Sequence, residues 1–123
     1  MNGGVDHRPA LALGGGIGHA GDVCGAVSAG AIAVGLLCGD HIADLQEAKL
    51  RSRQLVLPFY RDFAAEFGHV DCRSLIDLDI SSEEGFRVYL ESNLKKERCT
   101  RYVTYAVYRL LPLLDEVKAS VGK

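Results

Sequence analysis

The chain has 123 residues, 48% of them hydrophobic, and its 14 basic and 16 acidic side chains leave a formal net charge of −2. This length favours a single domain over residues 1–123, with residues 1–9 as a mobile N-terminal segment. The near-neutral charge argues against a surface that collects nucleic acid or anionic lipid. Because the N-terminus lacks the pattern of a secretory signal, we expect a cytoplasmic protein with reduced thiols.

A glycine-dense loop, Gly14 to Asp22, is followed by an uncharged run of small and apolar residues from Val23 to Gly39. An all-round apolar run of this length is typical of a helix buried at the centre of a domain, and it is short for a membrane span. The run therefore predicts a central helix and no membrane segment. Cys24 would lie at its N-terminus, where the helix dipole and free N–H groups lower a thiol pKa.

A second helix is predicted after Asp40, which is a suitable N-cap residue. Apolar residues recur at steps of three and four as far as Gly68, a natural helix stop. Pro58 lies inside this pattern and lacks a backbone donor, so we expect a kink or break near Leu57.

Two more helices are predicted in the C-terminal half. One is predicted to start at Ser81 or Ser82, since Ser81 and Glu84 have the spacing of a capping box, and to reach about Leu94. The last helix is expected over residues 97–117, with Pro112 as a late kink.

Strand candidates are limited to short fragments around residues 11–13 and 75–80. The pattern as a whole predicts an all-α bundle of about four main helices around the small-residue helix.

The glycine loop formally satisfies the G-x-G-x-x-G dinucleotide fingerprint. Gly16, Gly18, Gly21 and Gly25 are therefore the candidate cofactor-binding residues. A Rossmann unit also needs a buried strand before the loop and a second strand after the helix, and the sequence predicts a helix at that second place. These features favour a tight connection between elements, although amides at the helix start could hold an anion.

The segment Gly21-Asp22-Val23-Cys24-Gly25-Ala26-Val27-Ser28, followed by Cys38, resembles the core motif of the redox-active C-GCAxxG-C-C family. Cys72 and Cys99 correspond to later cysteines of that pattern. The resemblance covers roughly residues 11–111 and implies a helical fold with redox-active cysteines. The family pattern also has a cysteine before the glycine loop, and this sequence has none there. Its absence leaves open that the chain is a shortened member of the family.

Spacing restricts how the cysteines can act together. On one helix, Cys24 and Cys38 would be about 21 Å apart, whereas a disulfide tolerates about 7 Å between Cα atoms. A functional centre would therefore combine Cys24 with Cys72 and Cys99, each near the start of a segment. The leading interpretation is thiol-based redox chemistry with an unidentified partner protein, Cys24 attacking and Cys72 or Cys99 resolving the mixed species.

Two alternatives remain open from the sequence. The three thiolates and either His69 or His19 could form a Cys₃His set for zinc or, less comfortably, an iron–sulfur cluster, although no cofactor is required by the redox interpretation. Alternatively, the cysteines are structural, and the chain is a non-catalytic helical interaction domain that pairs with a second copy of itself. The sequence does not decide whether the protein is an enzyme.

Overall fold

The computed structural model describes residue 6 and residues 8–121. The predicted mobile segment, residues 1–9, lies mostly outside the described residues. A short 3-10 helix, Arg8–Ala10, precedes the glycine loop. The α-helices are α1 (Gly25–His41), α2 (Leu45–Phe67), α3 (Cys72–Ile76), α4 (Glu83–Glu91) and α5 (Thr100–Val121), and a π-helical turn, Lys95–Cys99, leads into α5.

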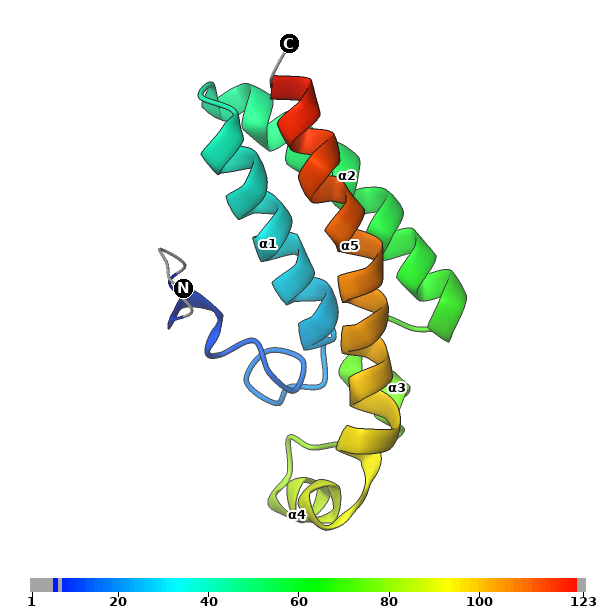
Figure 1. The fold of residues 1–123 in the computed structure, drawn as a ribbon. Helices are drawn as coiled ribbons and strands as arrows, with labels where there is room; N and C mark the ends of the chain where they lie inside the picture. Colours follow the sequence, from blue (N-terminus) through cyan, green and yellow to red (C-terminus); the bar gives the residue numbers. More distant parts are fainter. Residues whose placement is uncertain (1–5, 7, 122–123) are drawn as a thin grey trace.

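The predicted all-α class is confirmed, because pairing between extended segments in the described part of the chain is limited to one isolated bridge, Val23 with Asp71. The long helices α1, α2 and α5 lie side by side, and α3 and α4 lie near the end of the bundle where α1 begins (Figure 1). None of the helices formed by the described residues is both long and apolar enough to cross a bilayer.

Two buried clusters form the core. One lies at the end of the bundle that contains α3, and its members are Val27, Phe59, Phe63, Cys72, Leu75, Ile76, Ile80, Tyr102 and Ala106. The other consists of Val34, Cys38, Ala48, Leu55 and Val117, and Leu110 packs against both clusters. The bundle therefore has a single continuous core with two distinct ends.

The boundary between α1 and α2 differs from the prediction. Helix α1 continues to His41, so Asp40 lies inside it, and the N-cap of α2 is Asp44. The side chain of Asp44 accepts a hydrogen bond from the amide of Gln46 at 3.0 Å, which satisfies a first-turn donor. Helix α2 continues through Pro58 without a break and ends, as predicted, at Gly68 in the left-handed conformation.

The last two predicted helices also shift. Of the two predicted starts of α4, Ser81 and Ser82, the N-cap is Ser82, whose hydroxyl accepts the hydrogen bond from the amide of Gly85. This helix ends at Glu91, before the predicted Leu94. The π-helical turn separates it from α5, which therefore begins at Thr100 rather than at residue 97.

Helix α1 is not buried on all sides, as its composition suggested. Helices α2 and α5 cover the side that carries Val27, Gly30, Val34 and Cys38. The other side exposes apolar residues, among them Leu36, which is 48% exposed. The prediction of a central helix is therefore wrong in this respect, because two neighbouring helices can cover only about half of a helix surface.

Candidate thiol site

Backbone pairing between two loops brings Cys24 and Cys72 to the same end of the bundle. The amide of Cys24 donates to the carbonyl of Val70 at 2.7 Å, and the amide of Cys72 donates to the carbonyl of Asp22 at 2.7 Å. Each cysteine then begins a helix: Cys24 is the N-cap of α1 and Cys72 is the first residue of α3. The loops thus hold two helix starts, each with a thiol, against one another.

Cys99 joins this end of the molecule from the last residue of the π-helical turn. Its Sγ lies 3.6 Å from the hydroxyl oxygen of Tyr89 in α4. Two side chains next to it anchor the start of α5 to α3: the hydroxyl of Tyr102 and the guanidinium of Arg98 donate to the carbonyl of Leu75 at 2.7 and 3.3 Å. These bonds fix where Cys99 lies relative to α3.

All four cysteines lie in the described part of the chain as free thiols. Cys72 is a buried member of the α3-end cluster, and Cys24 and Cys99 are half-buried and pack against it. Cys38 is fully buried in the other cluster. The structure therefore brings together the three cysteines that the sequence grouped and separates the fourth from them, as the spacing along α1 requires.

Burial governs the protonation of this site. It raises the pKa of the Cys24 thiol, and the amides of Ala26 and Val27 at the start of α1 act in the opposite direction without outweighing it. Burial, with smaller contributions from the charges of Cys24 and Cys99, raises the pKa of Cys72 to about 11. The expectation of a lowered pKa at Cys24 is therefore wrong, because packing against the α3-end cluster removes the thiol from water.

The tyrosines next to the thiols respond to the same environment. Burial and the hydrogen bond with Cys99 raise the pKa of Tyr89. Burial also raises the pKa of Tyr102, with Cys99 and Cys24 adding to the effect. At neutral pH Cys24, Cys72, Tyr89 and Tyr102 are therefore in their neutral forms.

The glycine loop folds onto itself instead of presenting its amides. Five consecutive residues, Gly15 to His19, have φ angles between +59° and +75°. The amides from Ile17 to Asp22 all donate to carbonyls of residues 12–17 within the same segment. Gly16 is packed so closely that an added Cβ would lie 2.4 Å from the backbone nitrogen of Asp22.

The surroundings of the four candidate cofactor-binding glycines indicate that they shape the loop and do not bind a phosphate. Gly16 and Gly18 lie inside the left-handed turn, Gly21 packs against the side chain of Arg73, and Gly25 is the first residue of α1. A phosphate cradle needs amides that point outward, whereas the loop amides are engaged in internal hydrogen bonds. The loop serves as the tight connection that sets Asp22 and Cys24 against the start of α3.

The predicted Cys₃His ligand set is not formed. His69 is exposed in the turn before α3, and the ring of His19 packs against Phe86 with centroids 4.7 Å apart. Over residues 6 and 8–121, no three His, Cys, Asp or Glu side chains are grouped so that they could hold a metal ion. The thiols alone, without a histidine, make up the site.

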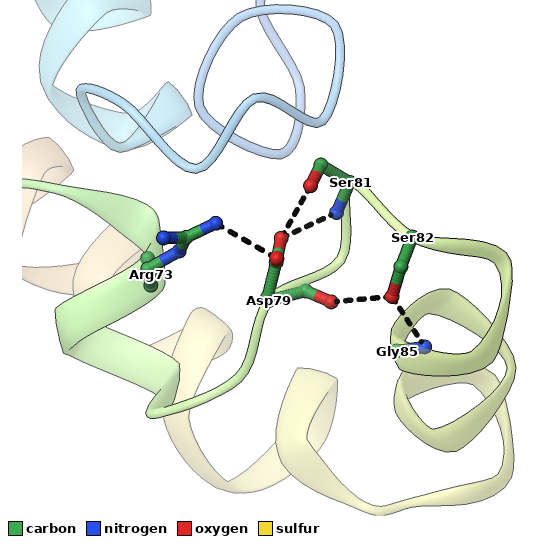
Figure 2. Close-up of polar contacts among 5 residues, drawn as sticks. All are labelled: Arg73, Asp79, Ser81, Ser82 and Gly85. Atoms are coloured by element: carbon green, nitrogen blue, oxygen red, sulfur yellow. Dashed lines mark hydrogen bonds and ion pairs between the residues drawn. The ribbon is translucent and has the colours of Figure 1, made fainter.

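A polar network stabilises the loop between α3 and α4 (Figure 2). The carboxylate of Asp79 accepts hydrogen bonds from the amide and hydroxyl of Ser81 and forms an ion pair with Arg73 at 2.8 Å. The hydroxyl of Ser82 donates to the carbonyl of Asp79 and accepts from the amide of Gly85. The network orients α4, the helix that carries Tyr89.

The profile of one protein family, described as "Putative redox-active protein (C_GCAxxG_C_C)", matches residues 7–111. The chain belongs to this family. The matched range contains the glycine loop and all four cysteines of this family member. Searches of curated proteins and of solved structures found no match. Family membership supports a redox-related role in general terms.

The structure adds Tyr89 and Tyr102 to the residues around the thiols. The sequence did not group either tyrosine with the cysteines. The distinguishing signal for Tyr102 is its position three residues after Cys99, close to one helical turn. No comparable signal exists for Tyr89, because the turn between α4 and α5 decides that it meets Cys99.

Proposed function

We propose that this chain is a thiol–disulfide redox protein in which Cys24 acts with Cys72 or Cys99 on a disulfide of a partner protein. The observation that carries the proposal is the convergence of three free thiols, from three separate segments, on one end of one apolar cluster. Membership in a redox-active family supports it. A structural role alone would not require the thiols to meet, and Cys38 is buried well away from them in the other cluster.

In the first step the thiolate of Cys24 attacks one sulfur of the partner disulfide. A bond forms between the Cys24 sulfur and that sulfur, the partner's S–S bond breaks, and its second sulfur leaves as a thiolate. Cys24 is the better attacker of the two cysteines with raised pKa values. It is only half-buried, and two amides at the start of α1 favour its thiolate, whereas the pKa of Cys72 is about 11.

In the second step the thiolate of Cys72 or Cys99 attacks the Cys24 sulfur of the mixed disulfide. The internal disulfide forms, and the partner's remaining sulfur leaves as a thiolate. The chain loses two electrons and two protons, and the partner disulfide gains them as two thiols. Tyr89 acts as a positioning residue for Cys99, since its hydroxyl lies within hydrogen-bond distance of the sulfur.

A redox titration in glutathione buffers, with thiols mapped by mass spectrometry, tests this proposal. We expect two thiols per chain to disappear in a single two-electron transition and the resulting disulfide to include Cys24. A Cys38→Ala variant should keep the transition, because Cys38 belongs to the other cluster, while Cys24→Ser should lose it. Retention of four thiols under oxidising conditions would overturn the proposal.

Metal analysis of protein purified anaerobically is the second test of the proposed function. Zinc or iron in a fixed ratio to the chain, lost in Cys72→Ser and kept in Cys38→Ala, would replace the redox proposal with the metal-carrier alternative. We expect no stoichiometric metal, because the histidines lie apart from the thiols.

A further inference from the structure

The two cysteines that could resolve a mixed disulfide at Cys24 have different surroundings. Cys72 is only 9% exposed and is a member of the buried α3-end cluster, whereas Cys99 is half-buried and packs against that cluster from outside. A resolving thiol has to reach the Cys24 sulfur while the partner is still attached to it. Exposure and freedom of movement therefore favour one cysteine over the other.

The backbone bridge that brings Cys24 and Cys72 to the same end of the bundle also limits how close they can come. Cys24 lies opposite Val70 in this antiparallel bridge, because its amide donates to the Val70 carbonyl. Cys72 lies opposite Asp22 in the same way. The two cysteines are therefore diagonal neighbours, which have Cα atoms about 7–8 Å apart, whereas a disulfide tolerates about 7 Å without backbone movement. Both lie at helix starts, where the backbone has little room to close the gap.

Cys99 is carried by a segment that can adjust its position. It is the last residue of the π-helical turn Lys95–Cys99, in which the hydroxyl of Thr100 donates to the carbonyl of Lys95 at 3.0 Å. A π-helical turn closes its hydrogen bonds over five residues instead of four, and such turns recur at functional sites. Arg98 and Tyr102 anchor this turn to α3 through side chains, which can follow a small shift that a backbone bridge resists.

Deprotonation also disfavours Cys72 as the resolving thiol. Burial raises its pKa to about 11, so roughly one molecule in 10⁴ carries this thiolate at pH 7. The carboxylate of Asp71, the preceding residue, adds to the effect. Cys99 has a hydroxyl beside it instead, that of Tyr89 at 3.6 Å, which can donate to a sulfur that becomes negative.

We propose, as an extension that depends on the thiol–disulfide function, that Cys99 is the resolving cysteine, positioned by Tyr89, and that Cys72 is a buried structural residue. The thiolate of Cys99 attacks the Cys24 sulfur of the mixed disulfide. The bond between Cys24 and Cys99 forms, and the bond from Cys24 to the partner breaks. The partner's sulfur leaves as a thiolate and takes up the proton that Cys99 released.

A time course with glutathione disulfide as the probe tests the proposal. The reduced full chain is mixed with the probe and quenched in acid, and its disulfides are located by mass spectrometry. We expect glutathione on Cys24 to appear first and to be replaced by a Cys24–Cys99 disulfide. Cys99→Ser should slow the loss of glutathione from Cys24 at least about tenfold, while Cys72→Ala should change it by less than about twofold.

The disulfide map of the wild type separates the outcomes even if a variant fails to fold. A Cys24–Cys72 disulfide would overturn this assignment of the resolving cysteine and leave the proposed function standing. Four free thiols, or glutathione that stays on Cys24 with no internal disulfide, would overturn the proposed function and this assignment together.

The role of Tyr89 is tested by comparing the two steps of the same reaction. Tyr89→Phe keeps the ring and removes the hydroxyl beside Cys99, so the second step should slow about tenfold while the first stays unchanged. Tyr105→Phe is the matched control, because Tyr105 packs against the same cluster and its ring contacts Phe63 and Phe67. An unchanged second step, or equal slowing of both steps, would overturn the assignment of Tyr89 as the residue that positions Cys99.

Discussion

Cys24 receives two opposing influences from its position at the start of α1. The amides of Ala26 and Val27 favour the thiolate, while packing against the α3-end cluster disfavours it, and burial is the larger influence. A helix terminus lowers a thiol pKa only where the sulfur keeps access to water or a positive partner. Reactivity at this site therefore depends on a change in its surroundings, such as the approach of a partner, or on alkaline pH.

The rate of alkylation, measured at a series of pH values, should reveal the raised pKa of Cys72. Because its pKa is about 11 instead of the ordinary 9.0, the modification rate should keep rising about tenfold per pH unit beyond pH 9. Rates of iodoacetamide modification at each cysteine, read by mass spectrometry, measure this slope independently of steric access. In Cys24→Ser the inflection should move to lower pH, since one charge is removed. A plateau near pH 9 in the wild type would contradict the prediction.

The same shift predicts how stability depends on pH. The folded-state pKa of Cys72 lies above its ordinary value, so its contribution is complete below about pH 9 and is lost as the pH rises through about 11. Thermal melts between pH 8 and 11 should show a decline that is smaller in Cys72→Ala. The decline should be equal in the two proteins if the thiol is not involved.

A substitution at Gly16 tests the conformation of the glycine loop. The φ of Gly16 is +75°, and an added Cβ would meet the backbone of Asp22, so Gly16→Ala should destabilise the fold by more than about 1 kcal/mol. Gly14→Ala is the control, because an added Cβ there has open space. Urea unfolding of both variants measures the difference. Equal midpoints would show that the loop does not adopt this turn.

At the scale of elements, the loop between α3 and α4 depends on one carboxylate. Hydrogen bonds from Ser81, followed by the interaction with Arg73, lower the pKa of Asp79 to about 2. A lowered folded-state pKa means that the contribution is present above about pH 3.8 and is lost as the pH falls through about 2. The docking of α4 should therefore loosen in acid before the long helices separate.

Amide hydrogen exchange of α4 between pH 2 and pH 5, corrected for intrinsic rates, measures this loosening. Asp79→Asn should speed the amide exchange of α4 already at pH 5. In this variant the exchange rate should then rise little further as the pH falls to 2. The matched control is Asp77→Asn, because Asp77 adopts a left-handed conformation that Asn also tolerates. If the two variants protect α4 equally, the network in Figure 2 does not hold this helix.

Element boundaries show where sequence reasoning works and where it does not. Apolar periodicity identified the long helices, and Gly68 marked the end of α2 correctly. Asp40 was predicted as the cap of α2, whose N-cap is Asp44, and the sequence left Ser81 and Ser82 open for α4, whose N-cap is Ser82. Adjacent capping residues are equivalent in sequence, and the choice between them depends on how the preceding segment packs.

At the scale of the whole molecule, grouping the three cysteines succeeded because each lies at the start of a segment and the segments meet at one end. The pKa direction at Cys24 could not be predicted, because it depends on burial against a cluster whose members, among them Phe63, Cys72 and Tyr102, are distant in sequence. The internal hydrogen bonds of the glycine loop were also missed, since five successive left-handed residues, including Ile17 and His19, have no simple sequence pattern.

The packing of the long helices depends on one glycine in particular. An added Cβ at Gly30 would lie 2.8 Å from Leu110 and 3.0 Å from the ring of Phe59, where α1, α2 and α5 meet. Gly30→Ala should therefore destabilise the protein by about 1–2 kcal/mol, since overpacking outweighs the better helix propensity of alanine. Gly35 lies in the same helix with open space around its Cα.

Gly35→Ala should consequently stabilise the protein by up to about 1 kcal/mol through helix propensity alone. Urea unfolding of the two variants compares the same chemical change at two positions of one helix, so propensity cancels and the difference reports packing. An opposite order of midpoints would mean that α1 presents a different side to α2 and α5. Because Leu110 packs against both core clusters, that result would also revise how the thiol end is joined to the rest of the bundle.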